Sequence, residues 1–211
     1  MPIVRQVVTR SPHRRVGLVA CPWFQALPVE YESLLERDFI RLALLDRDIS
    51  AISHQPFVMD LGDLGRYTPD FLLLSSSSKV VVEVKPSEFA SNSKNGPRLA
   101  RANEMLRLQG YRFFVATEKF IHSDKRHERA AILLRHARSR LPADISREVL
   151  HKASCAPEGV AIQTLAVRAA VPVPTVLALI GQRLLRIDSS LRFNNEALVF
   201  PTGEDHGYLS A

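Results

Sequence analysis

The spacing of apolar residues along the first part of the chain predicts one helix followed by three strands. Between Val29 and Arg47, apolar residues recur at the three- and four-residue intervals of an amphipathic helix. Shorter apolar segments follow, separated by turn-forming residues, and these predict strands. The expected strands are 49–59, 67–74 and 79–85, the last being rich in valine like a buried central strand.

The pattern then predicts a second helix and a fourth strand. After a polar loop over residues 87–96, Pro97 begins a helix that runs to Gln109 and is stopped by Gly110. Residues 111–116 form the next expected strand. A helix, three strands, a helix and a strand in this order predict a mixed α/β sheet with helices on its faces.

The C-terminal part has a different pattern. A basic helix is expected from Ser123, which would cap it, to about Arg140, and Pro142 marks a boundary. Beyond it, helices are expected over 145–152, 160–170 and 174–184, and strands over 185–188 and 197–200. Three helices and a terminal hairpin predict a winged-helix-like module. The expected organisation is a basic N-terminal arm (1–28), an α/β domain (29–142) and a winged-helix-like domain (143–211).

The composition argues against several classes of protein but does not by itself indicate a function. The chain has 28 Lys and Arg against 22 Asp and Glu, and this net charge of +6 suits a polyanionic partner without requiring one. Cys21 and Cys155 are far apart and form no paired motif, which argues against a zinc site or a disulfide framework. No apolar run approaches the roughly 18 residues of a membrane span, and no signal peptide is recognisable. We therefore expect a cytoplasmic protein with no membrane partner.

Two short motifs carry the candidate chemistry. Pro69-Asp70 precedes one apolar strand, and Glu83-Val84-Lys85 ends the next. Side chains two apart on a strand share a face, so Glu83 and Lys85 project together, and a hairpin would bring Asp70 alongside Glu83. Neighbouring carboxylates repel each other, and a divalent cation relieves that repulsion. The motifs therefore predict a Mg²⁺ site, in which Mn²⁺ can substitute.

A magnesium ion in such a site can bind a phosphate oxygen and lower the pKa of an attacking water. Lys85 would orient that water or stabilise charge in the transition state. This is the PD-(D/E)xK nuclease signature. The alternative is a chance triplet in which Glu83 and Lys85 form a solvated pair on the strand. The preceding Pro-Asp, the twelve intervening residues 71–82 and the upstream helical glutamates favour the nuclease.

A fourth acidic residue is expected from the first helix. Glu32 and Glu36 lie one helical turn apart, and Glu36 shares its strip with Ile40 and Ala43. A carboxylate on an otherwise apolar strip favours a functional role for Glu36, whereas a surface role for Glu32 is equally reasonable. Gln55 could contact the site or only set the edge of its strand, and the sequence leaves this open.

Four segments together resemble the TnsA-like endonuclease subunits of heteromeric transposases. They are residues 32–39, His54-Gln55-Pro56, residues 67–71 and residues 82–86. The resemblance implies a restriction-endonuclease-like fold, with the nuclease domain over 29–142. It also implies that Glu36 is the helical catalytic acid and that Lys85 is the catalytic lysine. The catalytic set is then Glu36, Asp70, Glu83 and Lys85, and the metal ligands are Asp70, Glu83, Glu36 and Val84.

By the same resemblance, the protein would cleave the 5′ ends of a transposon beside a DDE-type transposase subunit that acts on the 3′ ends. An AAA+ regulator would be a further partner, bound through the C-terminal domain. The nearly all-apolar run 174–180 also favours protein docking over DNA reading for that domain. The alternatives are a stand-alone restriction, repair or junction-resolving nuclease and an inert nuclease-like DNA-binding scaffold.

Overall fold

The computed structural model describes residues 16–202, which divide into two compact units between Ser123 and Asp124. Unit 1 contains described residues 16–123 and unit 2 contains residues 124–202. The arginines expected in a basic N-terminal arm lie outside the described residues; they are Arg5, Arg10, Arg14 and Arg15.

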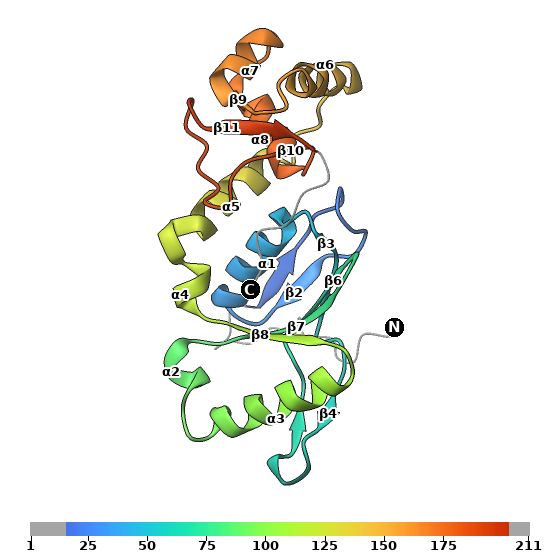
Figure 1. Cartoon of the computed structure of the whole chain (residues 1–211), viewed down its shortest axis with the longest axis vertical. Coiled ribbons are helices and arrows are strands. Elements are labelled where there is room, and N and C mark those ends of the chain that lie inside the picture. The colour runs from blue at the N-terminus through green and yellow to red at the C-terminus, as the bar shows by residue number, and fades with distance from the viewer. Residues whose placement is uncertain (1–15, 203–211) are drawn as a thin grey trace. The chain divides into compact units, whose positions relative to one another are not determined.

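Unit 1 is built on a mixed sheet of four strands in the order β3-β6-β7-β8, in which only β7 and β8 run parallel (Figure 1). Helices flank this sheet, as the sequence pattern predicted. Its elements are β1 (Gly17–Val19), β2 (Val29–Tyr31), α1 (Leu34–Leu45), β3 (Ile49–His54), β4 (Met59–Asp60), η1 (Gly62–Leu64), β5 (Arg66–Tyr67), β6 (Phe71–Ser75), β7 (Lys79–Val84), α2 (Ser87–Ala90), α3 (Asn95–Leu108), β8 (Arg112–Ala116) and α4 (Glu118–Ile121).

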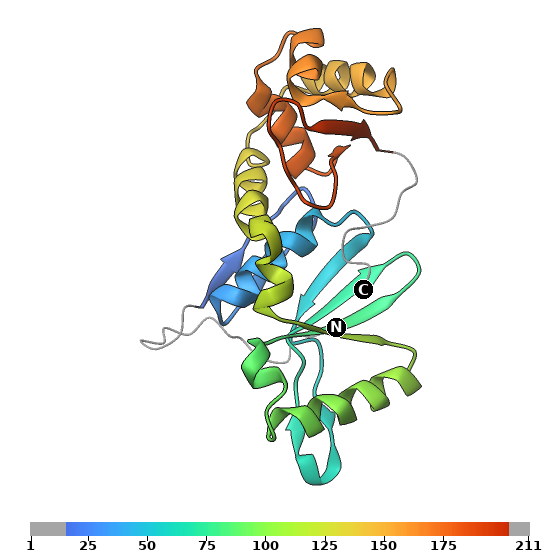
Figure 2. The same ribbon diagram turned by 60° about the vertical axis from the view of Figure 1, so that its left-hand side comes forward.

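Helices α1 and α3 lie on opposite faces of the sheet (Figures 1 and 2). On one face Phe39 of α1 stacks on Phe71 of β6 with ring centroids 5.7 Å apart, and both side chains are fully buried. On the other face Leu72 and Val81 join a core cluster with Leu106 of α3 and residues of the β4–β5 hairpin. Since side chains alternate between faces, these two cores fix which face each site residue takes.

Four expected segments in unit 1 differ from the structure. Residues 29–31 form strand β2 against β1, and the helix begins only after Ser33, whose hydroxyl caps it. The expected strand 49–59 is two strands, of which the second, β4, pairs with β5. The expected strand 67–74 is divided at Pro69, because proline has no N–H for the strand ladder. The expected loop 87–96 also contains the short helix α2.

Unit 2 contains the expected three short helices and two terminal strands, with an additional strand that the pattern did not reveal. Strand β9 joins the terminal pair in an antiparallel sheet of order β10-β11-β9. The elements are η2 (Ser123–Lys125), which begins at the last residue of unit 1, α5 (Arg126–His136), α6 (Ala143–Ser154), β9 (Val160–Ala161), α7 (Ile162–Arg168), α8 (Val173–Gly181), β10 (Leu185–Arg186) and β11 (Leu198–Pro201). Ser123 does not cap the basic helix, because Asp124 and Lys125 adopt positive φ angles before α5 starts.

Helix α5 belongs with the C-terminal elements, although the expected boundary at Pro142 separated them. It packs directly on α8, and the Gln182 side chain donates a hydrogen bond to the Ala137 carbonyl at 2.9 Å. Within α8, residues 175–181 are all buried in unit 2. The apolar run that favoured protein docking is therefore explained by the core of this unit, and it no longer supports a docking surface.

Within residues 16–202, no single helix combines the length and hydropathy that a membrane span needs. Helices α7 and α8 meet that criterion only as a pair, by length and composition, with a bend of 113° at the break between them.

The close approach of α5 to α8 predicts the effect of Gly181→Ala. A Cβ at this position would lie 2.8 Å from the Ala137 Cβ and would collide with the Leu133 carbonyl. We expect a loss of about 1–3 kcal/mol in unfolding free energy, measured by urea titration of the whole chain. Gly96 in α3 is the matched control, since a methyl group added there would have nothing within 4 Å and Gly96→Ala should stabilise by about 0.5–1 kcal/mol. A Gly181→Ala variant as stable as the wild type would contradict the packing.

Candidate active site

The start of β6 and the end of β7 lie next to each other at one edge of the sheet. The β6–β7 ladder ends with Phe71 opposite Val82, and Asp70 and Glu83 are the residues next to this last pair along the chain. The Val84 N–H donates to Asp70 Oδ2 at 2.7 Å, and the Asp70 carbonyl accepts from the Gln55 N–H at 2.8 Å. Asp70 is thus held between β3 and β7, with only one carboxylate oxygen bonded to the backbone.

Glu83 is the most enclosed carboxylate of the site, with 4% of its surface exposed. Its Oε2 accepts a hydrogen bond from the Tyr67 hydroxyl at 2.7 Å, and its Oε1 pairs with Lys85 Nζ. The expected projection of Glu83 and Lys85 from the same face of β7 is therefore present. Both oxygens of Glu83 have a donor, so its orientation is set from two sides.

Glu36 lies in the first turn of α1 and is 8% exposed. Its carboxylate accepts from the Glu32 N–H and from the Ser33 hydroxyl, both at 2.8 Å, and the Ser33 oxygen accepts from the Glu36 N–H at 3.1 Å. This reciprocal arrangement is a variant of the capping box. Glu36 therefore stabilises the start of α1, and the Ser-x-x-Glu spacing that signals this is visible in the sequence.

The pKa values of Asp70 and Glu36 are both raised, in part by the charges of neighbouring carboxylates. Burial raises the pKa of Asp70 well above its usual value, and the charges of Glu83 and Glu36 raise it further. Burial also raises the pKa of Glu36, with smaller contributions from Glu32 and Glu83. Glu36, which comes from the helix on the opposite face of the sheet, is thus electrostatically coupled to the two strand carboxylates.

This donor set fits a divalent cation. Glu36, Asp70 and Glu83 offer the oxygen ligands that Mg²⁺ and Mn²⁺ prefer, and their mutual repulsion is the energy that a cation would relieve. Val84 can contribute only its backbone carbonyl, because its side chain carries no donor atom and its N–H is already bonded to Asp70.

Gln55, whose role the sequence left open, contacts two members of this region. Its backbone adopts a φ of 42°, and its N–H bonds to Asp70 as described above. Its side-chain amide donates to Glu32 Oε1 at 3.2 Å. Gln55 therefore links Glu32 of the β2–α1 connection to the start of β6, which makes both residues supports of the site in this structure.

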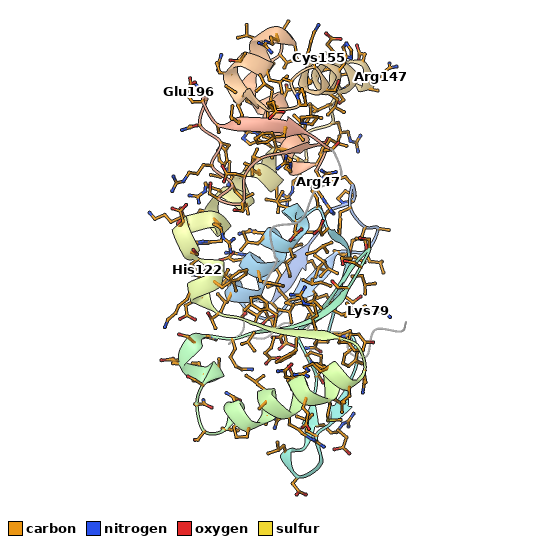
Figure 3. The ribbon with its side chains drawn as sticks, viewed as in Figure 1. Arg47, Lys79, His122, Arg147, Cys155 and Glu196 are labelled. Atoms are coloured by element: carbon orange, nitrogen blue, oxygen red, sulfur yellow. The ribbon has the colours of Figure 1, made fainter. Side chains whose placement is uncertain are left out.

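Asp38, another buried acid of α1, belongs to a separate cluster. Its carboxylate accepts hydrogen bonds from Arg37 and Arg41, and His122 Nε2 lies 3.4 Å away. His122 is labelled in Figure 3, after helix α4. Since two guanidinium groups already compensate Asp38, it is not grouped with the carboxylates at the sheet edge.

A cleft of about 300 Å³ opens beside Glu83 and Lys85. Its other lining residues come from the segment before β6 and from the start of α3; they are Tyr67, Thr68, Lys94, Asn95, Arg98 and Leu99. Lys94 and Arg98 were not predicted as site residues, because nothing in the local sequence of α3 shows that its first turn faces the end of β7. Tyr67 was included in the resemblance, but its bond to Glu83 was not foreseen.

The fold and the site together define the class of protein. It is an α/β domain with a mixed sheet, and acidic side chains and an adjacent lysine lie at one edge of that sheet. Residues 46–118 match the family model described as TnsA-like endonuclease N terminal. This match confirms the resemblance found from the motifs and assigns the segment to the TnsA-like endonucleases, a nuclease family related to transposase endonuclease subunits. No curated protein matches the chain. The matched segment includes Asp70, Glu83 and Lys85 but not Glu36.

Burial of Asp70 and the charges of its neighbouring carboxylates predict that this residue destabilises the metal-free protein at neutral pH. Its pKa is raised in the folded state, so the folded chain holds the proton more tightly than the unfolded chain does. The contribution of Asp70 to stability is therefore lost as the pH rises through its folded-state pKa and is regained as the pH falls toward the ordinary carboxyl range near about 4.

We expect Asp70→Asn to raise the thermal midpoint at pH 7 in EDTA, by about 2–4 °C for each kcal/mol of repulsion removed, and to flatten this pH dependence. The amide oxygen can still accept from the Val84 N–H, so the change removes charge without removing that bond. Asp63→Asn, at an exposed position in η1, is the matched control and should have little effect. A lower midpoint for Asp70→Asn at pH 7 would contradict the proposed repulsion.

Proposed function

We propose that this protein is a metal-dependent DNA endonuclease whose catalytic residues are Glu36, Asp70, Glu83 and Lys85. The observation that carries the proposal is the placement of Glu83 and Lys85 beside Asp70 at one sheet edge, with Glu36 close enough for its charge to raise the pKa of Asp70. The domain that contains them matches the TnsA-like endonucleases. The metal ligands would be Asp70, Glu83, Glu36 and the Val84 carbonyl, and the ion would be Mg²⁺, with Mn²⁺ as a substitute. The domain would have the restriction-endonuclease-like fold.

Each residue has a distinct task in the proposed reaction. Bound Mg²⁺ would polarise the scissile phosphate and lower the pKa of the attacking water. The Val84 N–H and the Tyr67 hydroxyl keep Asp70 and Glu83 in fixed orientations, so little rearrangement is needed when substrate binds. The ammonium group of Lys85, already beside Glu83, would orient the water or stabilise charge on the phosphate oxygens.

The proposed substrate is DNA at the 5′ ends of a transposon, cleaved together with a DDE-type transposase subunit. The family match supports a nuclease related to such subunits. We also propose that unit 2 contains a winged-helix-like domain, supported by the order α6-β9-α7-α8-β10-β11, and that an AAA+ regulator binds through it. Because α8 is buried, that contact would have to use another surface of unit 2.

A strand-specific nicking assay tests the catalytic assignment. Transposon-end DNA labelled on each strand would be incubated with Mg²⁺, the partner transposase and the wild type, Asp70→Ala or Lys85→Ala. We expect 5′-strand cleavage to fall by roughly 10²-fold or more in both variants, since each removes a group that stabilises the developing charge. Lys79→Ala is the matched control and should leave cleavage unchanged. Lys79 is an exposed lysine at the opposite end of β7 from Glu83, and it is labelled in Figure 3.

Equal cleavage by the wild type and Asp70→Ala would refute the mechanism and favour an inert scaffold. The same assay without the transposase distinguishes a stand-alone nuclease from a subunit of a heteromeric enzyme. Efficient cleavage of unrelated duplexes by the chain alone would identify a stand-alone nuclease, whereas cleavage that requires the transposase supports the heteromeric enzyme. Circular dichroism of each variant checks that the loss does not come from unfolding.

A further inference from the structure

We propose that Lys94 and Arg98, at the start of α3, bind a backbone phosphate of the DNA in the cleft beside Glu83 and Lys85. The inference rests on the proposed function for its substrate class. It adds a phosphate-binding site formed by α3, an element that supplies none of the expected catalytic residues. Such a site would position the strand that is cut.

The charge balance of the cleft is the first argument. Its lining includes three cationic side chains, Lys85, Lys94 and Arg98, and one carboxylate, Glu83. That carboxylate already has Lys85 on one oxygen and the Tyr67 hydroxyl on the other. The charges of Lys94 and Arg98 are therefore not balanced by any acid that lines the cleft. A phosphodiester carries the single negative charge that this surplus favours.

The two cations also share one face of the helix. Lys94 precedes α3 but already has helical backbone angles, with φ of −83° and ψ of −44°. Residues four apart then project from the same side, so Lys94 and Arg98 lie one above the other toward the cleft that both line. Two cations at this spacing repel each other unless an anion lies between them, which makes a bound phosphate favourable.

Arg98 is held in place before any ligand arrives. Its Nη2 donates a hydrogen bond to the Arg66 carbonyl in β5 at 2.7 Å, and its side chain is half-buried. The guanidinium has further N–H donors, whose planar arrangement matches two phosphate oxygens. Because the group is already ordered, it loses less side-chain entropy when it binds. Lys94 is exposed and forms no ion pair within residues 16–202, so its ammonium group can reach a phosphate as a mobile charge.

The loop before α3 is also ordered by its own hydrogen bonds. The Asn92 side chain accepts from the N–H groups of Lys94 and Asn95, and the Asn95 amide donates to the Phe89 carbonyl at 2.9 Å. These bonds fix the direction in which the chain enters the helix. The positions of Lys94 and Arg98 relative to the end of β7 therefore do not depend on the ligand.

The test is the salt dependence of DNA binding, measured by fluorescence anisotropy with a labelled transposon-end duplex and Ca²⁺ in place of Mg²⁺. The logarithm of the affinity falls as the logarithm of the salt concentration rises, and each lost phosphate contact makes this slope shallower by about 0.9. We expect Lys94→Ala and Arg98→Ala each to lower affinity several-fold at moderate salt and to reduce the slope by about 1, and the double variant to reduce it by about 2. Lys94→Arg should retain the wild-type slope.

Arg107→Ala is the matched control, because Arg107 is an exposed cation of the same helix that does not line this cleft. Unchanged slopes for Lys94→Ala and Arg98→Ala, equal losses for Arg107→Ala, or no DNA binding by the wild type would overturn the inference. The measurement does not use cleavage. Normal binding without nicking in the assay above would therefore refute the proposed function alone, and nicking with unchanged slopes would refute the phosphate site alone.

Discussion

The repulsion among Glu36, Asp70 and Glu83 is the interaction on which the candidate site depends. Burial, together with the charges of neighbouring carboxylates, raises the pKa of Asp70 and of Glu36. The Val84 N–H holds Asp70 in place, and the Tyr67 hydroxyl and Lys85 hold Glu83. Such an arrangement lowers the stability of the metal-free chain. It becomes favourable when a cation compensates the carboxylate charges, which is why the site supports the proposed metal-dependent nuclease better than a structural ion pair.

The two faces of the sheet contribute different residues to the candidate site. Val82 pairs with Phe71, which stacks on α1, whereas Val81 belongs to the core under α3. Strand alternation places Glu83 and Lys85 on the α3 side of β7. Helix α1 brings Glu36 to the same edge from the opposite side, and α3 lines the neighbouring cleft. The site therefore lies where both layers of unit 1 meet the end of β7.

Unit 2 shows how an apolar pattern can indicate two different environments. The run over 174–180 has the composition of a docking surface, but in the structure α8 is a core helix packed on α5. Helix α5 in turn belongs to this unit because Gly181 allows close approach to Leu133 and Ala137. Hydrophobicity specified that α8 is covered, and the location of α5 determined what covers it.

Three features could be predicted from the amino-acid sequence: the hairpin that brings Asp70 alongside Glu83, the shared face of Glu83 and Lys85, and the family that the motifs resemble. These are local properties, since the two-residue period of a strand and a short hairpin connection leave few arrangements. Three other relations are set by tertiary packing alone: the charge of Glu36 acts on Asp70, Tyr67 donates a hydrogen bond to Glu83, and Lys94 and Arg98 line the cleft. Those relations join segments far apart in the chain, and packing of helices on the sheet, rather than any local period, sets them.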